Sequence, residues 1–181
     1  GPPAPPPPPP VASLHWYTGA QAALSVVENV PRGVVVFGEL ERESPRLDLA
    51  FRLSLAMTNA DVELGTRSAR LSWATLNPEV CPLRLRSGVF SLSPCAGVSI
   101  GIESGVPTRG GESGRSFTRL WAAPRVALRG RAELADRLGL ELQGMLDAPL
   151  SRHRYRFGDE IAFTVPALFP SVALGVVLEL D

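Results

Sequence analysis

The C-terminal stretch Val172-Ala-Leu-Gly-Val-Val-Leu-Glu-Leu180 decides the fold class of this chain. Its even-numbered positions are all Val or Leu, whereas its odd-numbered positions are Ala, Gly, Val and Glu. Alternation with a period of two residues is typical of a β-strand that has one apolar face and one small or polar face. The stretch therefore predicts a β-strand with a single apolar face.

The same alternation recurs along most of the chain. Counting these segments predicts eight strands, at about 13–27, 33–43, 46–58, 66–85, 89–104, 117–134, 138–150 and 161–180. Several of them exceed the usual strand length of about five or six residues. The segment Arg131–Leu138 also has helical propensity, so a helix there stays open as an alternative.

The connections between these strands alternate in length. Short turns are expected at Ser44-Pro45, Ser87-Gly88 and Ala135–Arg137, and longer polar loops at Asn59–Gly65, Ser104–Ser116 and Ser151–Glu160. Short periplasmic turns and longer extracellular loops are typical of outer-membrane barrels, and an even strand count puts both chain ends on the short-turn side. The sequence therefore predicts an all-β, eight-stranded, antiparallel up-and-down transmembrane barrel.

Composition excludes several other classes of protein. Lys plus Arg and Asp plus Glu both number 18, which argues against nucleic-acid binding driven by net charge. No apolar run approaches the roughly 18 residues of a transmembrane helix. The length of 181 residues fits one folded domain.

Proline dominates the beginning of the chain. Eight of the first ten residues are proline, which predicts a stiff, solvated polyproline II segment. We expect residues 1–12 to be a proline-rich periplasmic linker and residues 13–181 to be the barrel. The segment carries no signal peptide pattern. It is expected to be either a simple tail or a spacer to an upstream domain.

Alternation alone does not say which face points outward. The apolar face is mostly Leu, Val and Ile, nearly free of charge, as a lipid-facing band requires. The other face mixes Gly, Ser and Ala with charges of both signs, which can fill a narrow lumen and pair there. These features favour a membrane barrel with a side-chain-filled lumen and no open pore. A soluble, lipocalin-like barrel that binds a hydrophobic ligand is the alternative.

The last strand resembles a known assembly signal. Gly175-Val-Val-Leu178-Glu-Leu180 is similar to the G-x-x-Φ-x-Φ signal of outer-membrane barrels, although Asp181 follows and the usual terminal aromatic residue is absent. The body resembles small eight-stranded barrels of the OmpA transmembrane-domain type. It is also similar to outer-membrane barrel proteins of myxobacteria, through Cys-Pro near 81, Pro-Cys near 94, Arg-Leu-Trp at 119–121 and Phe-x-Val-Pro at 163–166.

This resemblance implies a location and a set of partners. It implies the outer membrane of a Gram-negative bacterium, contact with the lipid bilayer, and the barrel assembly machinery as a partner during folding. It implies no activity. The expected role is structural, or anchoring an upstream periplasmic segment to the membrane.

The only two cysteines, Cys81 and Cys95, flank the expected turn at Ser87-Gly88. That turn pairs Leu85 with Phe90, and one extra residue near Cys81-Pro82 then brings the two cysteines opposite each other. An oxidising compartment permits a disulfide there. Free thiols are the alternative, and a metal site would need more ligands.

The expected hairpin around residues 135–137 aligns charges on the small and polar face. If Leu134 lies opposite Leu138, the register places Arg131 opposite Glu141 and Arg125 opposite Asp147. The same register aligns apolar residues on the other face. We therefore expect charge pairs in the lumen, where losing one partner leaves a buried charge.

Two sets of polar residues in the sequence are candidates for a functional role. Ser151, His153 and Asp159 have no diagnostic spacing, so we expect no enzyme, no cofactor and no metal. The basic loop residues Arg152, Arg154 and Arg156 are candidates for contact with lipopolysaccharide phosphates, because arginine binds phosphate in a bidentate manner. An ordinary solvated loop is the alternative reading of that segment.

Overall fold

The computed structural model describes residues 1, 13–27, 30–44, 48–64, 67–109, 116–151, 154–157 and 160–180. Most of the expected linker, residues 2–12, lies outside these residues, so its structure stays a prediction. In the described part of the chain, no helix is long and apolar enough to cross a membrane.

The described residues form β-strands throughout. Their bounds are β1 Ser13–Ser25, β2 Arg32–Glu43, β3 Leu49–Leu64, β4 Arg67–Cys81, β5 Leu85–Ser87, β6 Phe90–Arg109, β7 Phe117–Ala135, β8 Leu138–Asp147, β9 Arg154–Phe157, β10 Glu160–Thr164 and β11 Phe169–Leu180. The helical alternative for residues 131–138 is wrong, because these residues form the end of β7, a two-residue turn and the start of β8.

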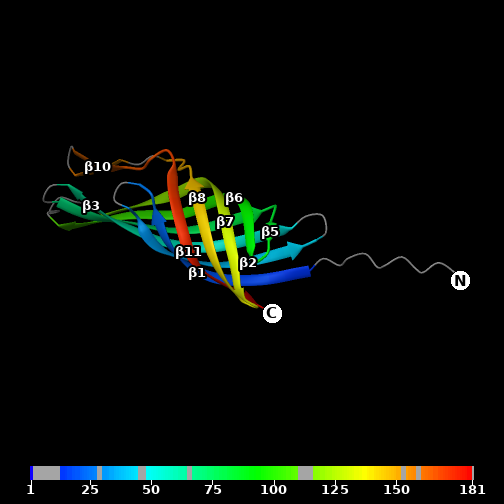
Figure 1. Cartoon of the computed structure of the whole chain (residues 1–181). Coiled ribbons are helices and arrows are strands. Elements are labelled where there is room, and N and C mark those ends of the chain that lie inside the picture. The colour runs from blue at the N-terminus through cyan, green and yellow to red at the C-terminus, as the bar shows by residue number, and fades with distance from the viewer. Residues whose placement is uncertain are drawn as a thin grey trace.

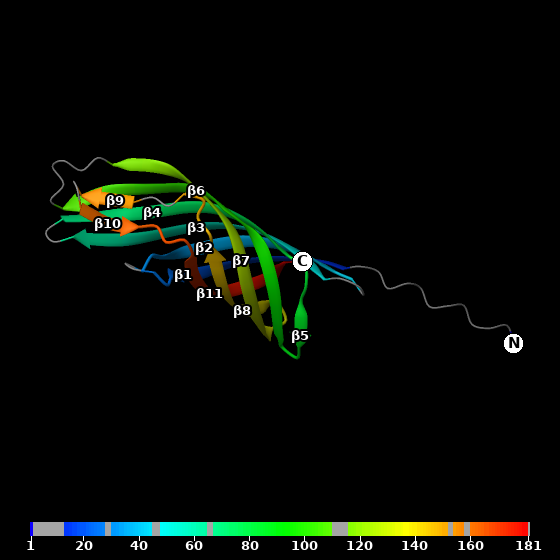
Figure 2. The same ribbon diagram turned by 90° about the horizontal axis from the view of Figure 1, so that it is seen from above.

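Among the described strands, eight close into an antiparallel ring (Figures 1 and 2). The ring runs β1-β2-β3-β4-β6-β7-β8-β11, and β11 pairs with β1 from Trp16↔Leu180 to Ser25↔Ser171. The short β5 pairs with β6 beside the ring, and β9 and β10 form a separate hairpin. A closed ring pairs the backbone groups along each wall strand, as a lipid environment requires. The predicted eight-stranded fold class is confirmed.

The two ends of the barrel differ. The short-turn end carries the β2–β3 and β4–β6 connections, the turn Asp136–Arg137, the start of β1 and the end of β11. The long-loop end carries the strand ends that the other connections join, together with the strands β9 and β10. Both ends of the described barrel therefore lie on one side, as the alternation of connections predicts.

Several predicted boundaries are wrong. The expected loops at 59–65 and 104–116 begin too early, because β3 continues to Leu64 and β6 to Arg109. Ala60 and Val62 point inward into an apolar cluster while Asp61 is exposed, so the pleat continues through residues that look like a polar loop. The expected last strand, 161–180, is interrupted at 165–168 into β10 and β11.

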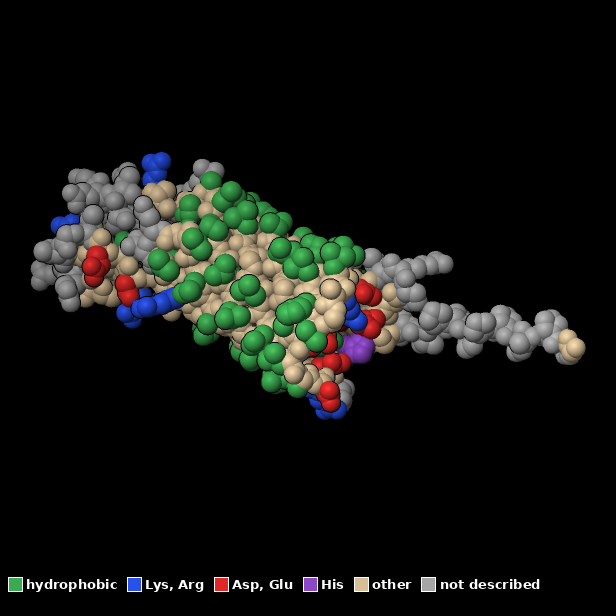
Figure 3. Space-filling model, in the orientation of Figure 1, with side chains coloured by type: hydrophobic (Ala, Val, Ile, Leu, Met, Phe, Trp, Pro, Cys, Tyr) green, Lys and Arg blue, Asp and Glu red, His purple; other side chains and the backbone are tan. Residues whose placement is uncertain are grey.

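The apolar face of the strands points outward. Along β11, Val172, Leu174 and Leu178 are exposed, whereas Ala173 and Val177 are buried. Figure 3 shows apolar side chains over the middle of the barrel and charged side chains gathered toward its ends. A soluble barrel with an apolar ligand cavity would need the opposite arrangement, so that alternative is wrong.

Candidate functional site

The lumen is filled at the long-loop end by an aromatic plug, which we define as Leu71, Trp73, Trp121, Val165 and Phe169. The three rings pack edge to face or tilted, with centroids 5.9 to 6.5 Å apart. Trp121 Nε1 donates a hydrogen bond to Ser99 Oγ at 3.2 Å. The plug closes this end with apolar side chains from β4, β7 and β11 and from the segment before β11.

Between the aromatic plug and the short-turn end lies a charge layer, which consists of four arginines and four carboxylates. It comprises Glu39, Arg52, Glu79, Arg125, Arg129, Arg131, Glu141 and Asp147, which come from β2, β3, β4, β7 and β8. All of these side chains are at least nine-tenths buried. Buried charges are tolerated only when they are paired and hydrogen-bonded, so their contacts decide whether this layer is stable.

Glu141 is the most connected carboxylate of the charge layer. Arg52 donates to both of its oxygens, at 2.6 and 2.7 Å, and Arg131 Nη2 donates to Oε2 at 2.9 Å. Gln21 Nε2 donates to Oε1 at 2.8 Å. Its side chain is fully buried, and both oxygens accept charged or polar donors, which offsets the cost of desolvation.

Glu39 and Glu79 each contact more than one arginine of the charge layer. Glu39 accepts from Arg52 Nε and Arg131 Nη2, each at 2.8 Å, and from Arg129. Glu79 accepts from Arg129 Nη2 at 3.1 Å and lies 3.5 Å from Arg125 Nη1. The pairs therefore share members and form one network.

Arg125 and Asp147 form the most self-contained pair of the layer. Arg125 Nε and Nη2 donate to the two carboxylate oxygens at 2.7 and 2.9 Å, a fork geometry that suits a carboxylate. The pair lies next to a cavity of about 50 Å³, which Trp73, Trp121 and Phe169 also line. A cavity of that size holds only a few waters.

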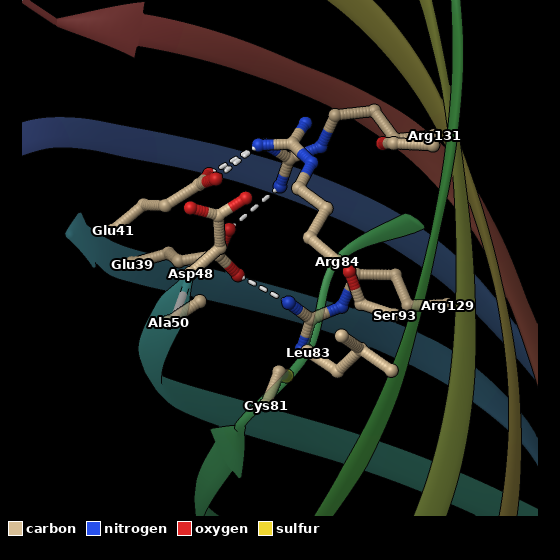
Figure 4. Close-up of a pocket in the computed structure, with 11 residues that line it drawn as sticks. Glu39, Glu41, Asp48, Ala50, Cys81, Leu83, Arg84, Ser93, Arg129 and Arg131 are labelled. Carbon is tan, nitrogen blue, oxygen red and sulfur yellow. Dashed lines mark hydrogen bonds and ion pairs between the residues drawn. The ribbon is translucent and has the colours of Figure 1, made fainter. Parts of the chain in front are cut away.

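The short-turn end is filled by Arg84 and Glu41 (Figure 4). Arg84 Nη1 donates to both oxygens of Glu41, whose side chain is 2% exposed, and Arg86 Nη2 donates to Glu41 at 3.1 Å. The cavity between Arg84 and the charge layer measures only about 10 Å³. Side chains thus occupy the described lumen at three successive levels.

A break in the wall strand places Arg84 in this position. The β4–β6 register pairs Val80 with Ala96 and, if continued, would set residue 84 opposite Leu92, but Leu85 lies there. One extra residue between β4 and β5 reverses which side chains point inward, so Arg84 turns into the barrel. The predicted strand 66–85 is therefore wrong beyond Cys81.

The Cys81–Cys95 disulfide joins β4 to β6 at this break, with the Cα atoms 4.1 Å apart. The predicted bridge is confirmed. The turn beyond it is Gly88-Val89, one position later than predicted, and Gly88 has a φ of +58°, which glycine adopts without strain. Among the described residues, no group of three His, Cys, Asp or Glu side chains could hold a metal ion.

No family model and no curated protein matches the chain. Solved structures do. A major outer membrane protein from Thermus thermophilus is 15% identical, with a TM-score of 0.73 over 93% of this chain and all of that one. Ail of Yersinia pestis is 11% identical, with a TM-score of 0.57 over 92% of this chain and 97% of that chain. Neisserial surface protein A is 10% identical, with a TM-score of 0.55 over 94% of this chain and all of that one.

The fold is that of a bacterial outer-membrane β-barrel. Identities of 10 to 15% show the fold alone, so the role of this barrel has to be argued from its own residues. The resemblance to the myxobacterial proteins stays a prediction.

The outer-membrane barrel brings together the charges that the hairpin register aligns. Arg125 lies opposite Asp147 and Arg131 opposite Glu141, both in the β7–β8 ladder. The expected pairing of Leu134 with Leu138 is wrong, because an irregularity after Glu133 sets Ala135 opposite Leu138. Toward the middle of the barrel, the β7–β8 ladder nevertheless has the predicted register.

The remaining predicted residues are spread over the barrel. Leu178 and Leu180 point outward and Gly175 inward, where a Cβ would lie 2.0 Å from the backbone oxygen of Ala20. Arg154 is exposed at the start of β9, whereas Arg152 and the side chain of Arg156 lie outside what the structure describes. His153 and Asp159 lie outside what the structure describes as well.

Sequence reasoning missed half of the lumen network, namely Glu39, Glu41, Arg52, Glu79 and Arg84. The signal was present for the first three, because they fall on the small and polar face of the expected strands 33–43 and 46–58. Glu39 and Arg52 lie opposite each other in the β2–β3 hairpin. Their other partners, such as Arg131 for Glu39 and Glu141 for Arg52, lie on strands that no hairpin joins to theirs, so local register does not identify those contacts.

Proposed function

We propose that this protein is a closed outer-membrane anchor that provides no transport path through its lumen. The observation that carries the proposal is the filling of the described lumen at three levels, by the aromatic plug, the charge layer and the Arg84–Glu41 pair. Eight-stranded barrels have interiors just wide enough for side chains to fill. The external apolar band supports residence in the bilayer.

The anchored element is the proline-rich segment before β1, with any periplasmic domain joined to it. Two observations support this part of the proposal. The strand β1 begins at the short-turn end, and short turns face the periplasm in barrels of this class. A polyproline II segment is a semi-rigid spacer of about 3.1 Å per residue.

Conductance tests the closed lumen. The purified protein should show no steady current in planar lipid bilayers. A porin inserted at the same protein density serves as the positive control, because it gives conductance steps. Trp73→Ala should not open the lumen either, because the charge layer lies below the plug. Reproducible ion-conducting steps of the unmodified protein would refute the closed lumen.

Topology tests the anchor. An epitope placed before Gly1 should be inaccessible to antibody on intact cells and accessible after the outer membrane is permeabilised. An epitope inserted between residues 112 and 113, in the β6–β7 connection, should be accessible on intact cells. The reversed pattern would contradict the proposed orientation.

The contact of Arg152, Arg154 and Arg156 with lipopolysaccharide phosphates remains part of the proposal. Its support is the place of Arg154, exposed at the long-loop end. The triple change to alanine should lower the lipopolysaccharide that copurifies with the barrel, whereas Arg42→Ala on β2 should not. Equal copurification of all three proteins would contradict this contact.

A further inference from the structure

The described lumen contains a level that side chains do not fill. Between the aromatic plug and the charge layer lies a cavity of about 50 Å³, which we call the lumen chamber. Its lining includes Trp73 and Phe169 of the plug and Arg125 and Asp147 of the charge layer. Most of the remaining lining side chains are short, among them Ala23, Ser25, Ala56, Ser99 and Ser171. Long side chains close the narrow interior of an eight-stranded barrel at the neighbouring levels, whereas side chains of this size leave a space.

The lining of the lumen chamber is polar on several sides. Hydroxyl groups from β1, β3, β4, β6 and β11 line it, on Ser25, Thr58, Thr75, Ser99 and Ser171. The guanidinium of Arg125 and the carboxylate of Asp147 add charged groups from β7 and β8. A cavity with purely apolar walls stays dry, whereas a buried water needs room and two to four polar partners. The lumen chamber meets both conditions.

Trp73 carries a buried hydrogen-bond donor on the same lining. The residue is only 5% exposed, and its Nε1 has no hydrogen-bond partner among the described residues. The indole of Trp121, which also lines the chamber, donates instead to Ser99 Oγ at 3.2 Å. A buried N–H without an acceptor loses the hydration that it had in water and gains nothing in return. The chamber beside Trp73 has room for the missing acceptor.

Charge and size determine which molecule fits the chamber. The neighbouring charge layer balances four arginines with four carboxylates, so an ion would add a buried charge without a partner. Water is neutral, accepts a hydrogen bond from an N–H and donates to hydroxyl or carboxylate oxygens, so one molecule serves both kinds of group. A volume of about 50 Å³ holds about three or four waters and no sugar-sized solute.

We propose that the lumen chamber is a binding site for a cluster of about three or four water molecules. One water accepts a hydrogen bond from Trp73 Nε1, and the cluster donates to the surrounding hydroxyl oxygens and to the carboxylate of Asp147. The cluster thereby joins the aromatic plug to the charge layer through hydrogen bonds, without opening a path for ions. This inference rests on the proposed closed lumen, because water in an open channel would exchange as fast as bulk solvent.

Nuclear magnetic resonance of the protein in detergent micelles tests the site. The indole N–H signal of Trp73, assigned by its loss in Trp73→Phe, should show a nuclear Overhauser effect from water. Its sign, compared with the rotating-frame effect, distinguishes water that is held in place from water that moves as in bulk solvent. Ala56→Leu places a larger side chain in the chamber, so the effect should be lost. The matched control is Ala74→Leu, which faces outward between Met57 and Ile102 and should keep the effect.

A crystal structure of the unmodified protein gives a second measurement that needs no variant. Electron density in the chamber should place a water about 2.7–3.2 Å from Trp73 Nε1. Crystals soaked in bromide should show no anomalous signal in the chamber, because its occupant is neutral. Crystals pressurised with xenon should show no xenon there, because the chamber is not dry. Heat-modifiable migration shows which variants are folded, and if Ala56→Leu does not fold, the crystallographic result decides alone.

Different results would overturn different statements. Xenon or bromide in the chamber, an unchanged water effect in folded Ala56→Leu, or an equal loss in Ala74→Leu overturns the water site only. Water at Trp73 that moves as in bulk solvent, together with ion-conducting steps in planar bilayers, overturns the closed lumen and this site with it.

Discussion

Arg52 on β3 donates to both carboxylate oxygens of Glu141 on β8, at 2.6 and 2.7 Å, across the lumen between strands that are not neighbours in the ring. Both side chains are almost completely buried. Neither charge would be stable there alone, because removing one partner of a buried pair typically costs about 3–5 kcal/mol. Closure of the barrel therefore completes the pairing of charges that come from opposite walls.

The Arg125–Asp147 pair offers the simplest test of charge coupling in the lumen. Arg125→Leu or Asp147→Leu alone should destabilise the barrel by about 3–5 kcal/mol, since each leaves the other charge buried. The double change should cost less than either single change. Urea unfolding in lipid vesicles, analysed as a double-mutant cycle, measures the coupling. Additive free energies would show that the two side chains do not interact.

Arg131 and Glu141 should also be coupled, but with a different pattern. Glu141 also accepts hydrogen bonds from Arg52 and Gln21, so it keeps those donors in Arg131→Leu. In Glu141→Leu, both Arg52 and Arg131 lose their contact with this carboxylate. We therefore expect Glu141→Leu to be the more destabilising single change, by about 3–5 kcal/mol. The double change should not restore stability, because Arg52 still lacks its partner. The same unfolding measurement checks the order, and a larger loss for Arg131→Leu would contradict it.

The disulfide should stabilise the barrel by restricting the unfolded chain. For a sequence separation of 14 between Cys81 and Cys95, the loop-entropy model gives about 3 kcal/mol. The double change Cys81→Ser, Cys95→Ser should lower the free energy of unfolding by about that amount, and reductant should have no further effect on it. Alkylation of the unreduced, unfolded protein should detect no thiol, and two reactive thiols would show that the bridge is absent.

Gly175 should be needed for closure between β1 and β11. Gly175→Ala places a Cβ 2.0 Å from the Ala20 backbone oxygen, so the strands must separate or shift. Gly144→Ala is the matched control, because a Cβ there meets nothing within 4 Å. We expect a lower yield of the heat-modifiable folded form for Gly175→Ala and an unchanged yield for Gly144→Ala. Equal yields would leave Gly175 without this packing role.

Arg84 should stabilise the short-turn end. Arg84→Ala leaves the buried Glu41 with Arg86 as its arginine partner, so we expect a loss of about 1–3 kcal/mol. Arg42→Ala, an exposed arginine on β2, should change stability by less than about 0.5 kcal/mol. Thermal unfolding in detergent compares the two variants, and equal midpoints would contradict a role for Arg84.

The sequence by itself determined the strands, their faces and the local pairings. Alternation along stretches such as 172–180 requires a sheet with one apolar face, because successive side chains point to opposite sides of a strand. Within a hairpin, the turn fixes the register, so the pairs Arg125–Asp147 and Cys81–Cys95 follow from residues close in the chain. Strand ends were less accurate, because outward polar residues such as Asp61 resemble a loop.

Only the tertiary structure decided which charges meet across the lumen and which side chains fill its two ends. Arg52 and Glu141 are 89 positions apart in the sequence. Their contact depends on the relative stagger of the strands and on closure of the ring that the described strands form. The cysteine spacing predicts one extra residue near Cys81-Pro82, but only the structure shows that the resulting change of register turns Arg84 inward. Because the lumen is narrow, long side chains reach several strands on its far side. Which side chains contact each other therefore depends on the geometry of the whole closed barrel.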